Sequence, residues 1–272
     1  MTLHDKLREK VTEWRDSKYE SEYTAISEIL DYNYDSEAQS FHYLRKAQFE
    51  ALENYWYLRL KEGTPHIFDL YKRFYPKPIE LLNSFGIPTE GSQEILELAF
   101  SGGIDSIFEK IKSDDAFVKN YRLEAVRETL ALAYPSYILA LAMGAGKTVL
   151  IGTIIATEFA MALEYPDGPF VNNALVFAPG KTILGALREL SDVPYEKILP
   201  GRLYKQFIAS VKFTYTHDGE KDIPIIKGSK FNLVVTNTEK IRIQKRSITK
   251  SLIRNLFTDP SKEDEIKQEV AN

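Results

Sequence analysis

The stretch that decides the fold is Leu141-Ala142-Met143-Gly144-Ala145-Gly146-Lys147-Thr148, with the apolar run 137–140 before it and Val149-Leu150-Ile151 after it. This order predicts a buried strand, a glycine-containing loop and a helix. Glycine lets a loop bend closely enough for several backbone N–H groups to point at a polyphosphate. The sequence therefore predicts a phosphate-binding loop.

Each residue of this loop matches one requirement of the chemistry. Gly144 and Gly146 allow the bend on either side of Ala145, and the Lys147 ammonium can reach the β- and γ-phosphates. The Thr148 hydroxyl can hold the accompanying metal ion, and the helix N-terminus adds its dipole. The expected cofactors are ATP and Mg²⁺. The alternative is an ordinary glycine turn after a buried strand.

The loop departs from the common phosphate-loop pattern, because Leu141 stands where that pattern has its first glycine. The form x-x-x-G-x-G-K-T resembles motif I of superfamily-two helicases and translocases. This resemblance implies an α/β fold with an incomplete RecA-like parallel sheet, as in P-loop NTPases. We expect a mainly helical region at 1–135 and the partial ATP-binding motor domain at 136–272.

Composition narrows the class of protein. The 272-residue chain has 44% hydrophobic and 27% charged residues, which is ordinary for a folded soluble protein. It contains no cysteine and only four histidines, so disulfides and thiolate metal sites are excluded and zinc is disfavoured. No apolar run approaches the ~18 residues that span a bilayer, so the cytoplasm is the expected location and no membrane partner is expected.

A second motif lies upstream in Leu44-Arg45-Lys46-Ala47-Gln48-Phe49-Glu50-Ala51, inside a helix predicted from about residue 40 to 62. It resembles the adenine-recognising glutamine motif of the same superfamily. The Gln48 amide offers a donor and an acceptor, which match the edge of adenine. The alternative is a surface glutamine on an amphipathic helix. The stretch 62–120 is interpreted as a helical insertion whose aromatic residues form a core rather than stack on bases.

Two strand ends downstream predict contacts to a nucleic-acid backbone. The first is the strand 174–178 followed by Pro179-Gly180-Lys181-Thr182 and a helix, and a helix N-terminus of this kind can bind a phosphate. The sequence of this segment resembles motif Ia of type III restriction-enzyme Res subunits. The alternative is a plain strand-to-helix turn.

The second strand end is Thr236-Asn237, after the apolar run 231–235, and it lies in a basic stretch that includes Arg242 and Lys245. Ligands of α/β proteins bind at the carboxyl ends of parallel strands, so both ends are expected to form one groove for DNA, with double-stranded DNA preferred to RNA. A solvated basic face is the alternative. Between these strands, Asp218-Gly219 separates the alternating runs 207–216 and 223–226, which predicts a hairpin.

The D-E-x-H box that hydrolysis requires in this superfamily does not occur in the sequence. We therefore expect an N-terminal portion of an ATP-dependent DNA helicase or translocase of the Res-subunit type, nearly inactive alone, with a modification or specificity subunit as a further partner. The alternative is a nucleotide-binding regulatory module that does not hydrolyse, with its acidic helical N-terminus as the partner surface.

Overall fold

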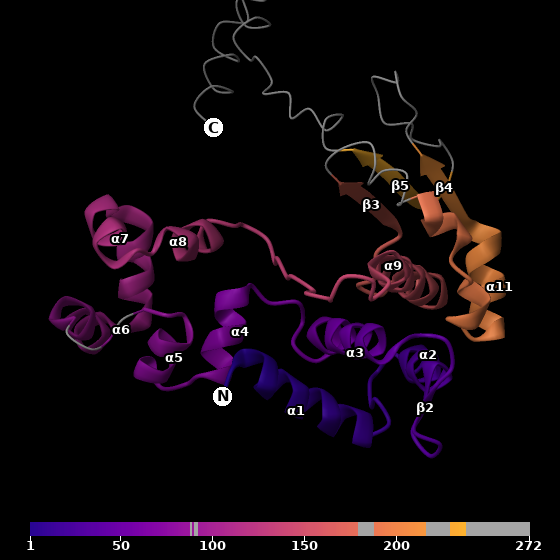
Figure 1. Ribbon diagram of the computed structural model, residues 1–272, viewed down its shortest axis with the longest axis horizontal. Helices are drawn as coiled ribbons and strands as arrows, with labels where there is room; N and C mark the ends of the chain where they lie inside the picture. The colour runs from indigo at the N-terminus through magenta and orange to yellow at the C-terminus, as the bar shows by residue number, and fades with distance from the viewer. Residues whose placement is uncertain (88, 90–91, 179–187, 216–228, 238–272) are drawn as a thin grey trace, which may run out of the picture.

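The computed structural model describes residues 1–87, 89, 92–178, 188–215 and 229–237 (Figure 1). In these residues the chain is predominantly helical and contains one small parallel sheet, so the expected mixture of helices and parallel strands is confirmed. The RecA-like form of the sheet stays a prediction.

The N-terminal region contributes three helices to the main core: α1 (Leu3–Asp16), α2 (Ala25–Asn33) and α3 (Lys46–Leu60). Helix α1 begins with a capping box, in which the Thr2 and Asp5 side chains satisfy each other's backbone N–H groups. A short antiparallel ribbon, β1 (Tyr34–Asp35) and β2 (Ser40–Phe41), joins α2 to α3. The helix predicted from residue 40 therefore begins six residues later.

The described residues of the insertion form four helices, α4 (Ile67–Phe74), α5 (Pro78–Ser84), α6 (Gln93–Ser113) and α7 (Asp115–Tyr121), and α8 (Glu124–Leu130) follows them. Phe68 and Phe108 are buried here, and Phe85 packs against both rings. The expectation of an aromatic core is thus confirmed for these three residues, whereas Phe100 is 79% exposed. Helix α6 is broken at Gly103, whose φ of 73° lies in the left-handed region.

The sheet and its covering helices occupy the second half of the chain. They are α9 (Lys147–Glu164), β3 (Asn173–Ala178), the 3₁₀ turns η1 (Arg188–Asp192) and η2 (Tyr195–Lys197), α11 (Gly201–Ser210), β4 (Val211–Tyr215) and β5 (Phe231–Asn237). The strand order is β3-β5-β4, and both pairs are parallel. Alternate residues of β5 are buried with α9 and α11 in one core, as a half-covered sheet requires: Phe231, Leu233 and Val235.

The first arm of the predicted hairpin is a strand only in part. Residues Phe207–Ser210 close α11, and the strand begins at Val211. Strand β4 pairs in parallel with β5, which is not the predicted second arm. The Asp218-Gly219 turn and the second run lie outside the described residues.

The predicted strand before the phosphate-binding loop is wrong. Residues 137–142 have no regular secondary structure, and the Ile138 and Met143 side chains are 91% and 98% exposed. A strand exists only where a neighbouring strand accepts and donates its backbone hydrogen bonds. Within the described sheet the run 137–142 pairs with no strand, so an apolar sequence alone did not make it one.

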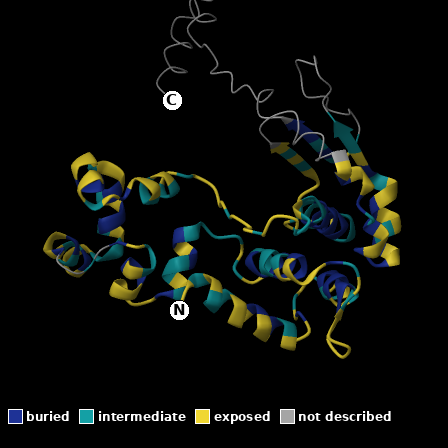
Figure 2. Cartoon of the chain, viewed as in Figure 1, coloured by how far each residue is buried: buried dark blue, intermediate teal, exposed yellow. Residues whose placement is uncertain are grey.

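The buried hydrophobic residues form two separate cores (Figure 2). The larger core joins α1–α3 to α9, α11 and the sheet, while the smaller core is formed by the insertion together with Leu123 and α8. The boundary expected at residue 135 does not follow this packing, because the first 60 residues pack with the second half of the chain.

Candidate nucleotide-binding site

The loop before α9 bends at its two glycines. Gly144 and Gly146 have φ of 74° and 78°, in the left-handed region that side chains disfavour. Gly146 meets a second constraint, because a Cβ atom there would lie 2.5 Å from Nε2 of Gln48. A Cβ atom at Gly144 would meet nothing within 4 Å. Both glycines are needed for backbone conformation, and Gly146 is also needed for close approach.

Gln48 contacts the loop directly, although it lies 98 residues earlier in the chain. Its Nε2 donates to the carbonyl oxygen of Gly146 at 2.9 Å, and its Oε1 accepts from the backbone N–H of Arg45 at 2.8 Å. The residue is only 3% exposed. The structure therefore brings the two sequence motifs together, and it shows that Gln48 is not a surface residue.

Arg45 is a site residue that the sequence reasoning did not single out. Its Nη1 donates to the carbonyl oxygen of Gly144 at 2.8 Å, and the side chain is exposed beside the loop. The signal was available, because Arg45 is the arginine of the L-R-x-x-Q motif that was interpreted only through its glutamine. The loop thus has a second cation besides Lys147.

Lys147 and Thr148 begin helix α9. Lys147 is exposed, and its ammonium donates to the carbonyl oxygen of Ala142 at 3.1 Å across the loop. Thr148 is half-buried in the first turn. The first N–H groups of a helix have no partner within it and carry the positive end of its dipole. This end of α9 is therefore suited to an anion.

Helices α3 and α9 lie parallel and in register. Gln48 at the start of α3 contacts Gly146 at the start of α9, and further along Trp56 Nε1 donates to Thr157 Oγ1 at 3.1 Å. Near the far end, Arg59 of α3 pairs with Glu158 of α9. Because the helices are parallel, both N-termini meet at the loop, which adds the positive ends of two dipoles to the two cations.

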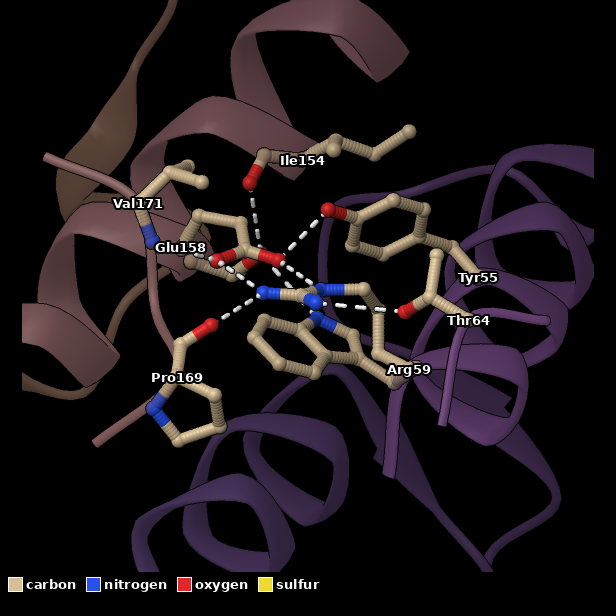
Figure 3. Close-up of polar contacts among 9 residues, drawn as sticks. Tyr55, Arg59, Thr64, Ile154, Glu158, Pro169 and Val171 are labelled. Carbon is tan, nitrogen blue, oxygen red and sulfur yellow. Dashed lines mark hydrogen bonds and ion pairs between the residues drawn. The ribbon is translucent and has the colours of Figure 1, made fainter. Parts of the chain in front are cut away.

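The far end of this helix pair is a buried polar cluster, which Figure 3 shows. Glu158 is 1% exposed and accepts from Arg59 Nε at 2.7 Å, from the Tyr55 hydroxyl at 2.5 Å and from the Val171 N–H at 3.1 Å. Arg59 also donates to the carbonyl oxygen of Pro169 at 2.7 Å and to Thr64 Oγ1 at 3.2 Å. Burial, with the charge of Glu158, raises the pKa of Tyr55 well above its usual range. We call Tyr55, Arg59 and Glu158 the α3–α9 clamp.

The strand ends expected to contact nucleic acid lie together. Strands β3 and β5 end at the same level, with Ala178 paired to Asn237. Phe159, in the second half of α9, packs on Phe231 at the start of β5. The Thr236 side chain is fully buried. Pro179, Lys181, Thr182, Arg242 and Lys245 lie outside the described residues.

A cavity of about 980 Å³ opens at the opposite, amino-terminal edge of the sheet, where Asn172, Lys212 and Lys230 contribute to its walls. None of the residues that line it belongs to the loop. Among the described residues no group of three or more histidine or carboxylate side chains could hold a metal ion, and no helix is long and apolar enough to cross a membrane.

Comparison with known proteins gave no match: no family model, curated protein or solved structure is significantly similar to the chain. The function must therefore be argued from the residues and their geometry.

Proposed function

We propose that the chain binds a nucleoside triphosphate, with ATP as the expected ligand, and that it forms the N-terminal portion of an ATP-dependent DNA translocase resembling type III restriction Res subunits. The observation that carries the proposal is the junction of two distant motifs. Gln48 and Arg45 donate to the carbonyl oxygens of Gly146 and Gly144 in the loop. An accidental glycine turn gives no reason for an upstream glutamine and arginine to meet it.

The chemistry follows from the groups at the loop. Exposed Arg45 and Lys147 supply positive charge, and the N-termini of α3 and α9 add N–H donors for phosphate oxygens. Magnesium is commonly held by few protein ligands together with the phosphates, so the Thr148 hydroxyl in the first turn of α9 fits as its one protein ligand here. The bound ion would neutralise phosphate charge.

Replacing Lys147 by alanine tests the nucleotide site. Loss of the ammonium at the loop is expected to lower the affinity for labelled ATP at least about tenfold, equivalent to about 1.4 kcal/mol. The matched control is Lys205→Ala on the exposed side of α11, which removes the same charge and should leave binding unchanged. Equal ATP binding by wild type and Lys147→Ala, with both folded by circular dichroism, would contradict the proposed site.

The DNA part of the proposal is supported by the adjacent carboxyl ends of β3 and β5, because α/β proteins bind ligands at that edge of a parallel sheet. Lys181, Arg242 and Lys245 are the proposed backbone contacts. Their triple replacement by alanine should weaken binding to duplex DNA of any sequence and reduce the salt slope by up to about one unit per contact. The measurement is a salt titration of binding to two unrelated duplexes.

The burial of Thr236 favours a second candidate, a nucleotide-binding regulatory module without a DNA groove. The same titration separates the two functions. ATP binding together with DNA binding that is absent, or that ignores both salt and the triple replacement, would support the regulatory module.

A further inference from the structure

We propose that this site recognises the triphosphate and not the base, and that Gln48 is a positioning residue for the loop instead of a reader of adenine. The ligand class is then any nucleoside triphosphate, and inorganic triphosphate as well. This inference rests on the proposed nucleotide site and corrects the specificity expected from the motif.

The hydrogen-bonding capacity of Gln48 carries the first step. A glutamine amide has two N–H donors and two acceptor positions. One donor is used by the carbonyl of Gly146 and one acceptor position by the N–H of Arg45, and both of these partners are backbone groups of the protein. Only 3% of the residue is exposed, so the remaining donor and acceptor present almost no surface to the edge of a base.

The second step concerns what the bond to Gly146 does. The carbonyl oxygen of Gly146 accepts from Gln48 and also from the N–H of Leu150, at 2.9 and 3.2 Å. In a trans peptide the C=O and the following N–H point in opposite directions. Holding the Gly146 carbonyl toward α3 and α9 therefore directs the Lys147 N–H out of the helix end, where a phosphate oxygen would accept from it.

A closed circuit of contacts makes this arrangement rigid. Gln48 accepts from the Arg45 backbone and holds Gly146, while the Arg45 side chain holds Gly144 two residues earlier in the loop. The lack of space for a Cβ atom at Gly146 shows how closely the amide and the loop approach. The circuit acts on the loop that would bind phosphates, and none of its contacts requires a base.

The test compares three ligands, ATP, GTP and inorganic triphosphate, with and without Mg²⁺, on wild type and Gln48→Glu. Glutamate has nearly the same shape and still accepts from Arg45, but its carboxylate cannot donate to the Gly146 carbonyl. We expect wild type to bind ATP and GTP within about threefold of each other. Gln48→Glu should weaken all three ligands by one common factor of roughly tenfold.

Two further variants complete the experiment. Gln206→Glu introduces the same charge on the exposed side of α11 and should change none of the affinities. Gln48→Met removes both hydrogen bonds without adding charge, so it replaces Gln48→Glu if that variant does not fold, and it should again weaken all ligands equally.

The outcomes separate this inference from the proposed function. If wild type binds none of the three ligands, the nucleotide site itself fails. If wild type binds ATP but prefers it to GTP at least about tenfold, and the Gln48 variants abolish that preference, Gln48 reads adenine and the inference is overturned while the site stands. Unchanged affinities in both Gln48 variants would overturn the positioning role.

Discussion

The two ends of the α3–α9 pair are built from different kinds of contact. At the far end, Glu158 is buried and Arg59 is mostly shielded, and their charges are matched by hydrogen bonds. At the near end, Arg45 and Lys147 are exposed and donate to backbone carbonyls of the loop. One end stabilises the fold, and the other leaves its positive charge available to a ligand.

The comparison shows how stability and binding can be separated along one pair of helices. Gln48 and Arg59 are eleven residues apart on α3, which is about 16 Å of helix at 1.5 Å per residue. Because the clamp fixes the register of α3 against α9, it also determines that Gln48 lies opposite Gly146. Breaking the clamp should cost the most unfolding free energy, whereas removing an exposed cation at the loop should leave the stability nearly unchanged.

The largest effect is expected for Glu158→Ala. Removing one member of a buried ion pair leaves the Arg59 charge unmatched, which typically costs about 3–5 kcal/mol of unfolding free energy. The control is Glu164→Ala, later on the same helix. The ion pair of Glu164 with Arg202 is partly exposed, so its loss should lower the unfolding free energy by less than about 1 kcal/mol. Urea unfolding measures both. Similar losses of unfolding free energy in the two variants would mean that the clamp stabilises the fold no more than an ordinary ion pair of α9 does.

The next effect compares Gly146→Ala with Gly144→Ala. Both place a side chain at positive φ, which costs about 1 kcal/mol, but only Gly146→Ala also drives a Cβ atom against Gln48. We expect about 2–3 kcal/mol for Gly146→Ala in total, with a matching loss of ATP affinity. Thermal unfolding and ATP titration test this order. The reverse order would mean that the contact with Gln48 is not close in solution.

Arg45→Ala should lower the affinity for the ligand and leave the stability of the fold nearly unchanged. It removes an exposed cation beside the loop, so ATP affinity should fall by about 1 kcal/mol, roughly fivefold, while stability changes by less than about 0.5 kcal/mol. Lys46→Ala is the control. Lys46 is adjacent to Arg45 in the sequence, and its ammonium lies 3.9 Å from Glu50 on the same helix. A stability loss in Arg45→Ala without an affinity loss would assign this arginine to the fold instead of the site.

The smallest effect at neutral pH concerns Tyr55 of the clamp. Its pKa is raised in the folded protein, chiefly by burial, above the ordinary value of 10.0. The stability that the protonated phenol contributes is therefore complete below pH 10 and is lost as the pH rises further, by up to about 1.4 kcal/mol per unit. Unfolding free energies between pH 8 and 11 should decline less in Tyr55→Phe than in wild type. Parallel declines would exclude Tyr55 as a contributor.

Much of the local structure could be read from the sequence. The helix expected after the loop occurs at Lys147–Glu164, and the strands expected at 174–178 and from 231 onward occur as β3 and β5, because continuous apolar runs between turn residues give a strong signal. The aromatic residues of the insertion form a core of their own. The run 137–140 carries the same apolar signal as β5 but forms no strand, since pairing depends on neighbours that the run itself does not contain.

The sequence by itself determined the bend of the loop and the residues around it: two glycines, a lysine and a threonine at a helix start, and a glutamine motif upstream. Only the tertiary structure decided that Arg45 and Gln48 hold the loop, that α3 and α9 are parallel, and that a buried clamp fixes their register. The physical reason is the separation along the chain of the residues that interact. Backbone conformation and helix periodicity depend on residues within a few positions, whereas contacts across about 100 residues depend on how the whole core packs.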